Sequence, residues 1–187
     1  MEPEEERWAA EIENLRPLLN LLARQNLNPR LWKDIDPSGV VQETLLEATV
    51  KQGQFRGNGP LALEAWLRAM FLHNLYDAIR KIHREKRDVD REVALICAIN
   101  KSTIRLQLQL SNHDSSPSAK AMRRENLLAL AAALEGLEPA QREAVELHHL
   151  QGRSLAESAA LMGRSESAVA ALLHRGMVKL KSLLKEG

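Results

Sequence analysis

The segment from Ser154 to Leu184 limits the possible folds more than any other part of the sequence. Ser154 and Glu157 have the spacing of a capping box at the start of a short helix. A turn that contains Gly163 follows, and Ser165 then occupies the N-cap position of a longer helix that reaches about Leu184. This order is typical of a helix-turn-helix unit, which presents its second helix to the major groove of DNA. An ordinary helical hairpin inside a bundle would have the same pattern.

The rest of the chain is also dominated by helical periodicity. Apolar residues recur at helical spacing in five further segments: Trp8 to Leu22, Asp36 to about Gly53, Leu61 to Arg84, Ser118 to Leu134 and Pro139 to Leu150. In the first of these segments, Pro17 indicates either a kink in the helix or the start of a new one. Residues 93–110 are ambiguous, and residues 111–118 read as a polar linker. We therefore expect an all-α protein with two small helical domains, 1–92 and 119–187, joined by a linker over 93–118, with the helix-turn-helix in the second domain.

Composition excludes several classes of protein. The formal net charge of the 187 residues is +1, so the total charge does not indicate a nucleic-acid binder, and local clusters must be considered instead. Cys97 is the single cysteine, which excludes an internal disulfide and a zinc site built on a CxxC pair. The acidic start of the chain is the opposite of a signal peptide, and no apolar stretch is long enough to span a bilayer. We expect a cytoplasmic protein without membrane insertion.

An enzyme is the less favoured class. No motif places a nucleophile beside a base, and none has the spacing of a metal-ligand set. We therefore expect no catalytic residue, no bound metal and no cofactor. Trp66 could stack on a base, but in an apolar stripe a tryptophan is more often a core residue.

The largest local cluster of positive charge follows Asp77. It consists of Arg80, Lys81, Arg84, Lys86 and Arg87, opposed by Glu85. Such residues can neutralise phosphates and release counterions from DNA. They are equally suited to a solvated helix end, where positive charge complements the helix dipole, and taken alone this second interpretation is the commoner one.

Two separate parts of the chain resemble one family. The segment from Asp36 to Ala48 resembles the polymerase-binding helix of bacterial sigma factors, and Trp66, Leu67, Asn74, Asp77 and Arg80 resemble the promoter-melting helix of the same domain. The segments 137–145 and 165–175 resemble the C-terminal sigma domain. Their order and spacing are similar to the extracytoplasmic-function (ECF) class, which keeps only the second and fourth sigma domains. Details of the sequence are similar to a subgroup that is common in planctomycetes.

The resemblance implies a sigma factor that binds core RNA polymerase and directs promoter recognition, melting and initiation. The polymerase-binding residues would be Asp36, Val40, Val41, Gln42, Glu43 and Leu46. The residues at the −10 element would be Asn74, Asp77, Arg80, Lys81, His83, Arg84, Lys86 and Arg87. The loop from His83 to Asp90 would capture a flipped base, at a cost of a few kcal/mol supplied by binding energy alone.

The resemblance also implies that the last helix reads the −35 element. The residues that would contact this DNA are Arg164, Ser165, Ala170, Ala171, His174, Arg175, Lys179 and Lys181. Family members often have Lys or Arg at the positions of Ala170 and Leu172. Few side chains of this helix can make a bidentate contact to a base, so we expect weak readout, with the two alanines near thymine methyl groups.

The expected partners are core RNA polymerase, promoter DNA and an anti-sigma factor, since factors of this class are commonly held by one. Two alternatives remain open. A helix-turn-helix regulator that never meets polymerase would form a homodimer and bind a palindromic site. A protein-interaction adaptor would show no salt-dependent affinity for DNA.

Overall fold

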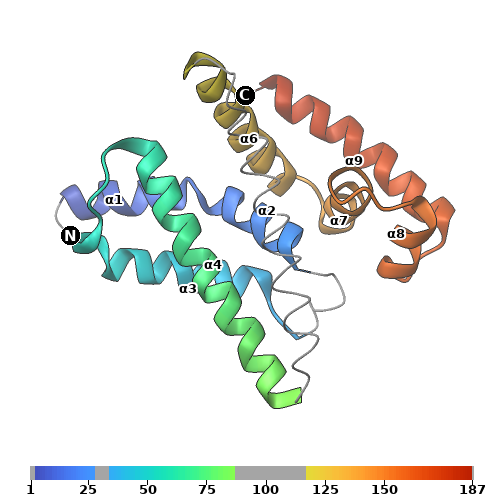
Figure 1. The fold of residues 1–187 in the computed structure, drawn as a ribbon. Helices are drawn as coiled ribbons and strands as arrows, with labels where there is room; N and C mark the ends of the chain where they lie inside the picture. The colour runs from blue at the N-terminus through green and yellow to red at the C-terminus, as the bar shows by residue number, and fades with distance from the viewer. Residues whose placement is uncertain (1–2, 28–33, 87–116, 187) are drawn as a thin grey trace. The chain divides into compact units, whose positions relative to one another are not determined.

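The computed structural model describes residues 3–27, 34–86 and 117–186, and these residues are helical with short connections and contain no strand (Figure 1). The chain divides into two compact units, residues 1–109 and 110–187. The predicted all-α architecture with two helical domains is therefore confirmed. The predicted linker over 93–118 lies outside the described residues except for its last two positions, so its boundaries stay a prediction.

In the described part of the chain, no helix combines the length and the apolar character that a membrane crossing would require.

The first unit contains four α-helices in its described residues. They are α1 (Pro3–Glu13), α2 (Arg16–Asn26), α3 (Pro37–Val50) and α4 (Gly59–Lys86), with a short 3-10 turn η2 (Gln52–Gln54) after α3. Of the two alternatives at Pro17, the restart is correct. Pro17 lies in the first turn of α2, where a missing backbone N–H costs nothing because it would have no partner within the helix.

The core of the first unit centres on α3, whose contacts with α4 and with α2 are the most extensive in this unit. The predicted apolar stripe of α4 is buried at Leu67, Phe71, Leu75 and Ile79. Trp66 is half-buried in a cluster with Trp8 and Phe55, with ring centroids 5.5 to 6.0 Å apart. This cluster joins α1 and the segment after α3 to α4.

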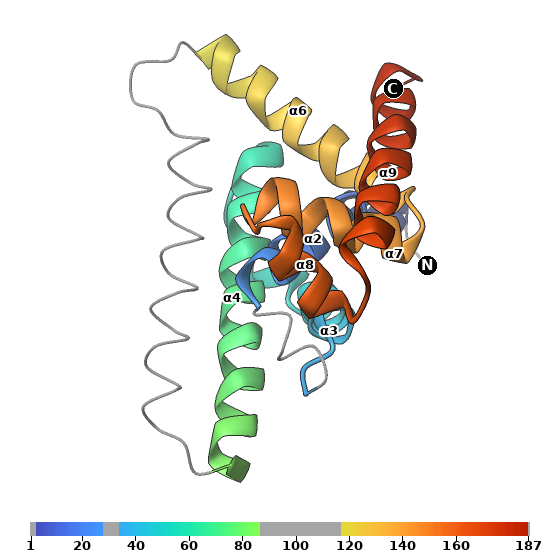
Figure 2. The ribbon, with the colours of Figure 1, turned by 90° about the vertical axis from the view of Figure 1, so that its right-hand side faces the viewer.

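The second unit contains α6 (Pro117–Glu135), α7 (Pro139–Val145), the π-helical turn η3 (Glu146–Leu150), α8 (Leu155–Met162) and α9 (Glu166–Glu186). The helix predicted from Pro139 to Leu150 is present, but its last five residues are π-helical. In Figure 2, α7 and α8 lie beside the first part of α9, which continues to the C-terminus.

Local capping builds the helix-turn-helix as the sequence predicts. The Ser154 hydroxyl accepts a hydrogen bond from the Glu157 backbone at 3.2 Å, and the Glu157 carboxylate accepts one from the Ser154 backbone at 2.8 Å. Gly163 ends α8 in the left-handed conformation, with φ of 62°. The Ser165 hydroxyl then accepts a hydrogen bond from the Ala168 backbone at 3.2 Å and caps α9. These caps orient α9 relative to α8.

Gly176 brings α7 and α9 close together. A Cβ atom at Gly176 would lie 3.1 Å from Val145 Cγ2 and 3.3 Å from Gln141 Cβ, both on α7. Both distances are shorter than ordinary van der Waals contact between carbon atoms. A larger side chain would therefore push the two helices apart.

Replacing Gly176 by valine should lower the free energy of unfolding of the second unit by about 1–3 kcal/mol, the usual cost of overpacking. Urea denaturation of the full chain, followed by far-UV circular dichroism, measures this loss. All three tryptophans belong to the first unit, so the fluorescence transition should not move.

The matched control is Ala171→Val, which places the same β-branched side chain at an exposed position of the same helix. Its expected cost is no more than about 0.7 kcal/mol, from helix propensity. Coincident dichroism curves for the two variants would show that the close contact at Gly176 does not matter.

Candidate functional site

A groove opens between α3 and α4 on the surface of the first unit. Its lining comes from both helices and consists of Gly39, Gln42, Glu43, Leu46, Glu47, Val50, His73, Asn74 and Asp77. We call it the α3–α4 groove. Leu46 and Val50 are 60% and 86% exposed, although both are large apolar residues. Since they are one helical turn apart, they form an apolar ridge along one wall of the groove.

Three of the six predicted polymerase-binding residues line this groove: Gln42, Glu43 and Leu46. Val40 and Val41 do not line it. They are 5% and 0% exposed because they belong to the face of α3 that packs in the core, which leaves their side chains little surface to offer a partner. The Asp36 carboxylate accepts hydrogen bonds from the backbone N–H and the hydroxyl of Ser38, at 3.0 and 2.6 Å, and caps α3.

The sequence interpretation missed Gly39, Glu47, Val50 and His73 as members of the groove. Val50 was detectable, since it lies four residues after Leu46 and therefore on the same helical face. Glu47 was detectable in the same way, since it lies four residues after Glu43, but its hydrogen bond to α4 could not be predicted, because that bond depends on a contact between the two helices.

That contact is made by Asn74 of α4. Its side-chain amide donates hydrogen bonds to the Glu47 carboxylate at 2.9 Å and to the Thr44 hydroxyl at 3.2 Å, both on α3. Thr44 is fully buried and donates in turn to the backbone carbonyl of Val40 at 2.8 Å. Asn74 therefore fixes α4 to α3. The resemblance grouped it with the −10 residues, but in the structure it shares the groove with the polymerase-binding set.

Negative charge lines the groove. Glu43 is exposed, Glu47 pairs with Lys51, and Asp77 lies 3.2 Å from the His73 imidazole. The hydrogen bond from Lys51, followed by the hydrogen bond from Asn74, holds the pKa of Glu47 below its usual value. Glu47 is consequently a carboxylate at neutral pH. A groove with an apolar ridge and acidic groups suits a partner surface that presents apolar and basic side chains.

The basic side of α4 follows the groove toward the C-terminal end of the helix. Arg80 and Lys81, two of the residues expected at the −10 element, are exposed. Helix α4 continues through Lys86, so residues 83–86 are helical where the resemblance implied a loop. Arg87 and the rest of that loop lie outside the described residues, as do the side chains of His83, Arg84 and Lys86.

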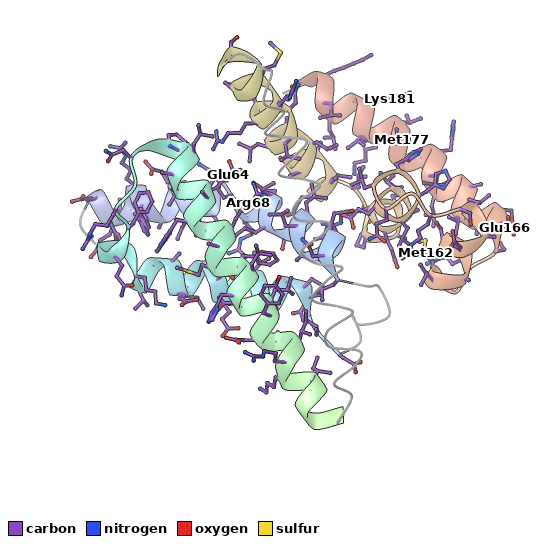
Figure 3. The ribbon with its side chains drawn as sticks, in the orientation of Figure 1. Glu64, Arg68, Met162, Glu166, Met177 and Lys181 are labelled. Atoms are coloured by element: carbon purple, nitrogen blue, oxygen red, sulfur yellow. The ribbon has the colours of Figure 1, made fainter. Side chains whose placement is uncertain are left out.

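The second candidate surface is formed by α9 and the turn before it. All of the predicted −35 residues in this part of the chain have exposed side chains: Arg164, Ser165, Ala170, Ala171, His174, Arg175, Lys179 and Lys181. Figure 3 shows Glu166 in the first turn of α9 and Lys181 farther along the same helix. The opposite face of α9 is buried at Val169, Leu173 and Leu180. One face thus holds the helix in the domain and the other is available to a partner.

His148 and His149, near the end of η3, contact groups close to them in the chain. The His148 ring nitrogen Nδ1 lies 2.8 Å from the carbonyl oxygen of Arg153, and the His149 ring lies edge-on to His148. Within the described ranges, no three side chains of His, Cys, Asp or Glu are grouped so that they could bind a metal ion.

Comparison with known proteins bears on the second unit. Residues 127–180, which include α7, α8 and most of α9, match the family model described as Sigma-70, region 4. The comparison with curated proteins found no match.

Two solved structures are similar to the chain. One is the sigma factor RpoE in complex with the anti-sigma factor NepR from Bartonella quintana, at 23% identity over 94% of this chain and 95% of that one, with a TM-score of 0.35. The other is the RsbN-BldN complex, at 20% identity over 96% of both chains, with a TM-score of 0.34. These two similarities concern the fold. The family match, the α3–α4 groove and the exposed face of α9 are the observations that bear on function.

Replacing Asn74 by alanine should lower the free energy of unfolding of the first unit by about 1–2 kcal/mol at neutral pH, because the Glu47 carboxylate loses a charged hydrogen bond. The Asn74 bond lowers the folded-state pKa of Glu47, so its stabilisation is present above the ordinary pKa of about 4.3 and is lost as the pH falls below it. The difference in the free energy of unfolding between wild type and variant should therefore be largest at pH 7 and smaller at pH 3. Tryptophan fluorescence in urea measures it.

A suitable control is Asn58→Ala, at an exposed position before α4, which should change stability by no more than about 0.5 kcal/mol. If the Asn74 variant were as stable as this control at neutral pH, the bond between α3 and α4 would have no structural role.

Proposed function

We propose that the chain is an ECF-type sigma factor, which binds core RNA polymerase and directs promoter recognition, melting and transcription initiation. The observation that carries this proposal is the match of residues 127–180 to Sigma-70 region 4, on a segment that is folded as a capped helix-turn-helix. The proposal covers the predicted layout, in which 1–92 is the polymerase-binding and −10 domain and 119–187 the −35 domain.

In this proposal the α3–α4 groove docks on the polymerase. Leu46 and Val50 supply apolar area, and Gln42 and Glu43 supply polar contacts beside it. The acidic groups of the groove favour a helical partner with basic and apolar side chains, such as the coiled coil of the polymerase clamp. Charge complementarity would speed association and fix the orientation of the partner, while burial of the exposed Leu46 and Val50 side chains would add affinity.

The exposed basic residues beyond the groove would meet the −10 element. Arg80 and Lys81 can neutralise phosphates at the end of α4, and Arg84, Lys86 and Arg87 extend the positive charge along the sequence. Flipping a base costs a few kcal/mol, which binding to phosphates and to the unstacked base can offset. Melting driven by binding energy requires no catalytic residue and no cofactor in this chain.

The −35 element would lie against α9, with the recognition helix in the major groove. A cytoplasmic location, regulation by an anti-sigma partner and membership of a planctomycete-like subgroup are further parts of the proposal, and they rest on the sequence resemblance.

The test changes the docking surface without disturbing the fold. Replacing Leu46 by lysine retains helix propensity, removes apolar area and places a positive charge where a basic partner is expected. The affinity of the full chain for purified core RNA polymerase should fall by about tenfold or more, as for a central interface residue. Biolayer interferometry with immobilised polymerase measures this change.

Leu61→Lys is the matched control, because Leu61 is 69% exposed on the same unit and is not part of the groove. This variant should bind like the wild type. Equal binding by the Leu46 and Leu61 variants would contradict docking through the groove, and a wild-type chain that does not bind core polymerase would contradict the proposed function.

A further inference from the structure

The exposed face of α9 has an unusual composition for a surface that contacts DNA. Its middle is formed by Ala170, Ala171, His174 and Val178, which we call the central strip. All four side chains are exposed, and Val178 is 58% exposed although it is apolar. At about 100° per residue, the four positions fall within an arc of about 100° on the helix. They form a continuous strip over about two turns, beginning one turn after the start of α9.

Positive charge lies along one side of this strip and beyond its end. At about 100° per residue, Arg175 and Lys179 fall on one side, Lys181 continues the line of the strip about one turn after Val178, and Arg164 precedes the helix. All four cations are exposed (Figure 3 labels Lys181). A helix that enters the major groove has phosphates on both sides and base edges in front of it. The arrangement suits this environment, since the cations beside the strip and at its two ends can reach phosphates while the strip faces the bases.

The strip has little capacity to read hydrogen-bond patterns. The alanine and valine side chains have no donor or acceptor, and His174 is the strip's single hydrogen-bonding side chain. Alanine side chains are also small, so the helix backbone can approach the base edges closely. The base feature that complements an alanine methyl group in the major groove is the C5 methyl group of thymine.

We propose that α9 recognises its DNA element through thymine C5 methyl groups that contact Ala170 and Ala171. This inference rests on the proposed function and specifies the chemistry of the upstream element: it contains thymines, on either strand, at the positions opposite the start of α9. The flanking cations provide affinity that does not depend on sequence, and the methyl contacts provide the discrimination.

Uracil offers a direct test, because deoxyuridine differs from thymidine only by the C5 methyl group. Duplexes are first selected from a random library by the full chain bound to core RNA polymerase, and the shared upstream element is identified. Thymines of that element are then replaced by uracil one at a time. Uracil at a position that contacts Ala170 or Ala171 should weaken binding by about fourfold, the value expected for one buried methyl group.

Two controls separate the methyl contacts from general effects. Uracils placed between the two promoter elements should leave affinity unchanged. In the double variant Ala170→Ser, Ala171→Ser, the loss on replacing thymine by uracil should disappear, because the protein side of the contact is already changed. Ala132→Ser, at an exposed position of α6, should keep the full loss.

The inference is overturned if uracil in the element binds as well as thymine, or if the double serine variant is still weakened by uracil. In both cases the proposed function would still be supported, because the complex of the chain with polymerase would still have selected specific duplexes. If that complex selects no duplex beyond those taken by core polymerase alone, the proposed function fails and the inference fails with it.

Discussion

The packing of α3 against α4 determines which side chains of the first unit reach solvent. One face of α3 is buried at Val41 and Leu45 against the apolar stripe of α4, and this leaves Leu46 and Val50 exposed on the other face. Asn74 adds a polar connection that places Glu47 beside the groove. The α3–α4 groove and the residues that precede the basic end of α4 therefore belong to one packed pair of helices. A change in the packing would alter both.

In the second unit, the packing of a single helix, α9, determines which side chains reach solvent. Gly176, Leu173 and Leu180 hold α9 against the domain, and the caps at Ser154 and Ser165 define the turn between α8 and α9. The outward face can then vary in composition without loss of the fold. In this chain, the outward face of α9 carries a strip of small and apolar side chains with cations beside it and at its ends, and His174 is the one hydrogen-bonding side chain of that strip.

Much of the fold could be predicted from the sequence, because the signals are local. The caps at Asp36, Ser154 and Ser165 and the stripe along α4 depend on residues a few positions apart. The site was harder to predict. Val40 and Val41 lie in the motif that resembles a polymerase-binding helix, but which face of that helix is buried depends on α2 and α4. The bond from Asn74 to Glu47 joins residues far apart in sequence, and no local pattern indicates it.

We propose that this chain directs core RNA polymerase to specific promoters. The most direct measurement is transcription of fragmented DNA from the source organism by purified core polymerase, with and without the full chain, followed by sequencing of the transcripts. The account predicts discrete start sites that require the chain and share an upstream motif. It would be contradicted if the folded chain produced no start sites while the same polymerase responded to a control sigma factor.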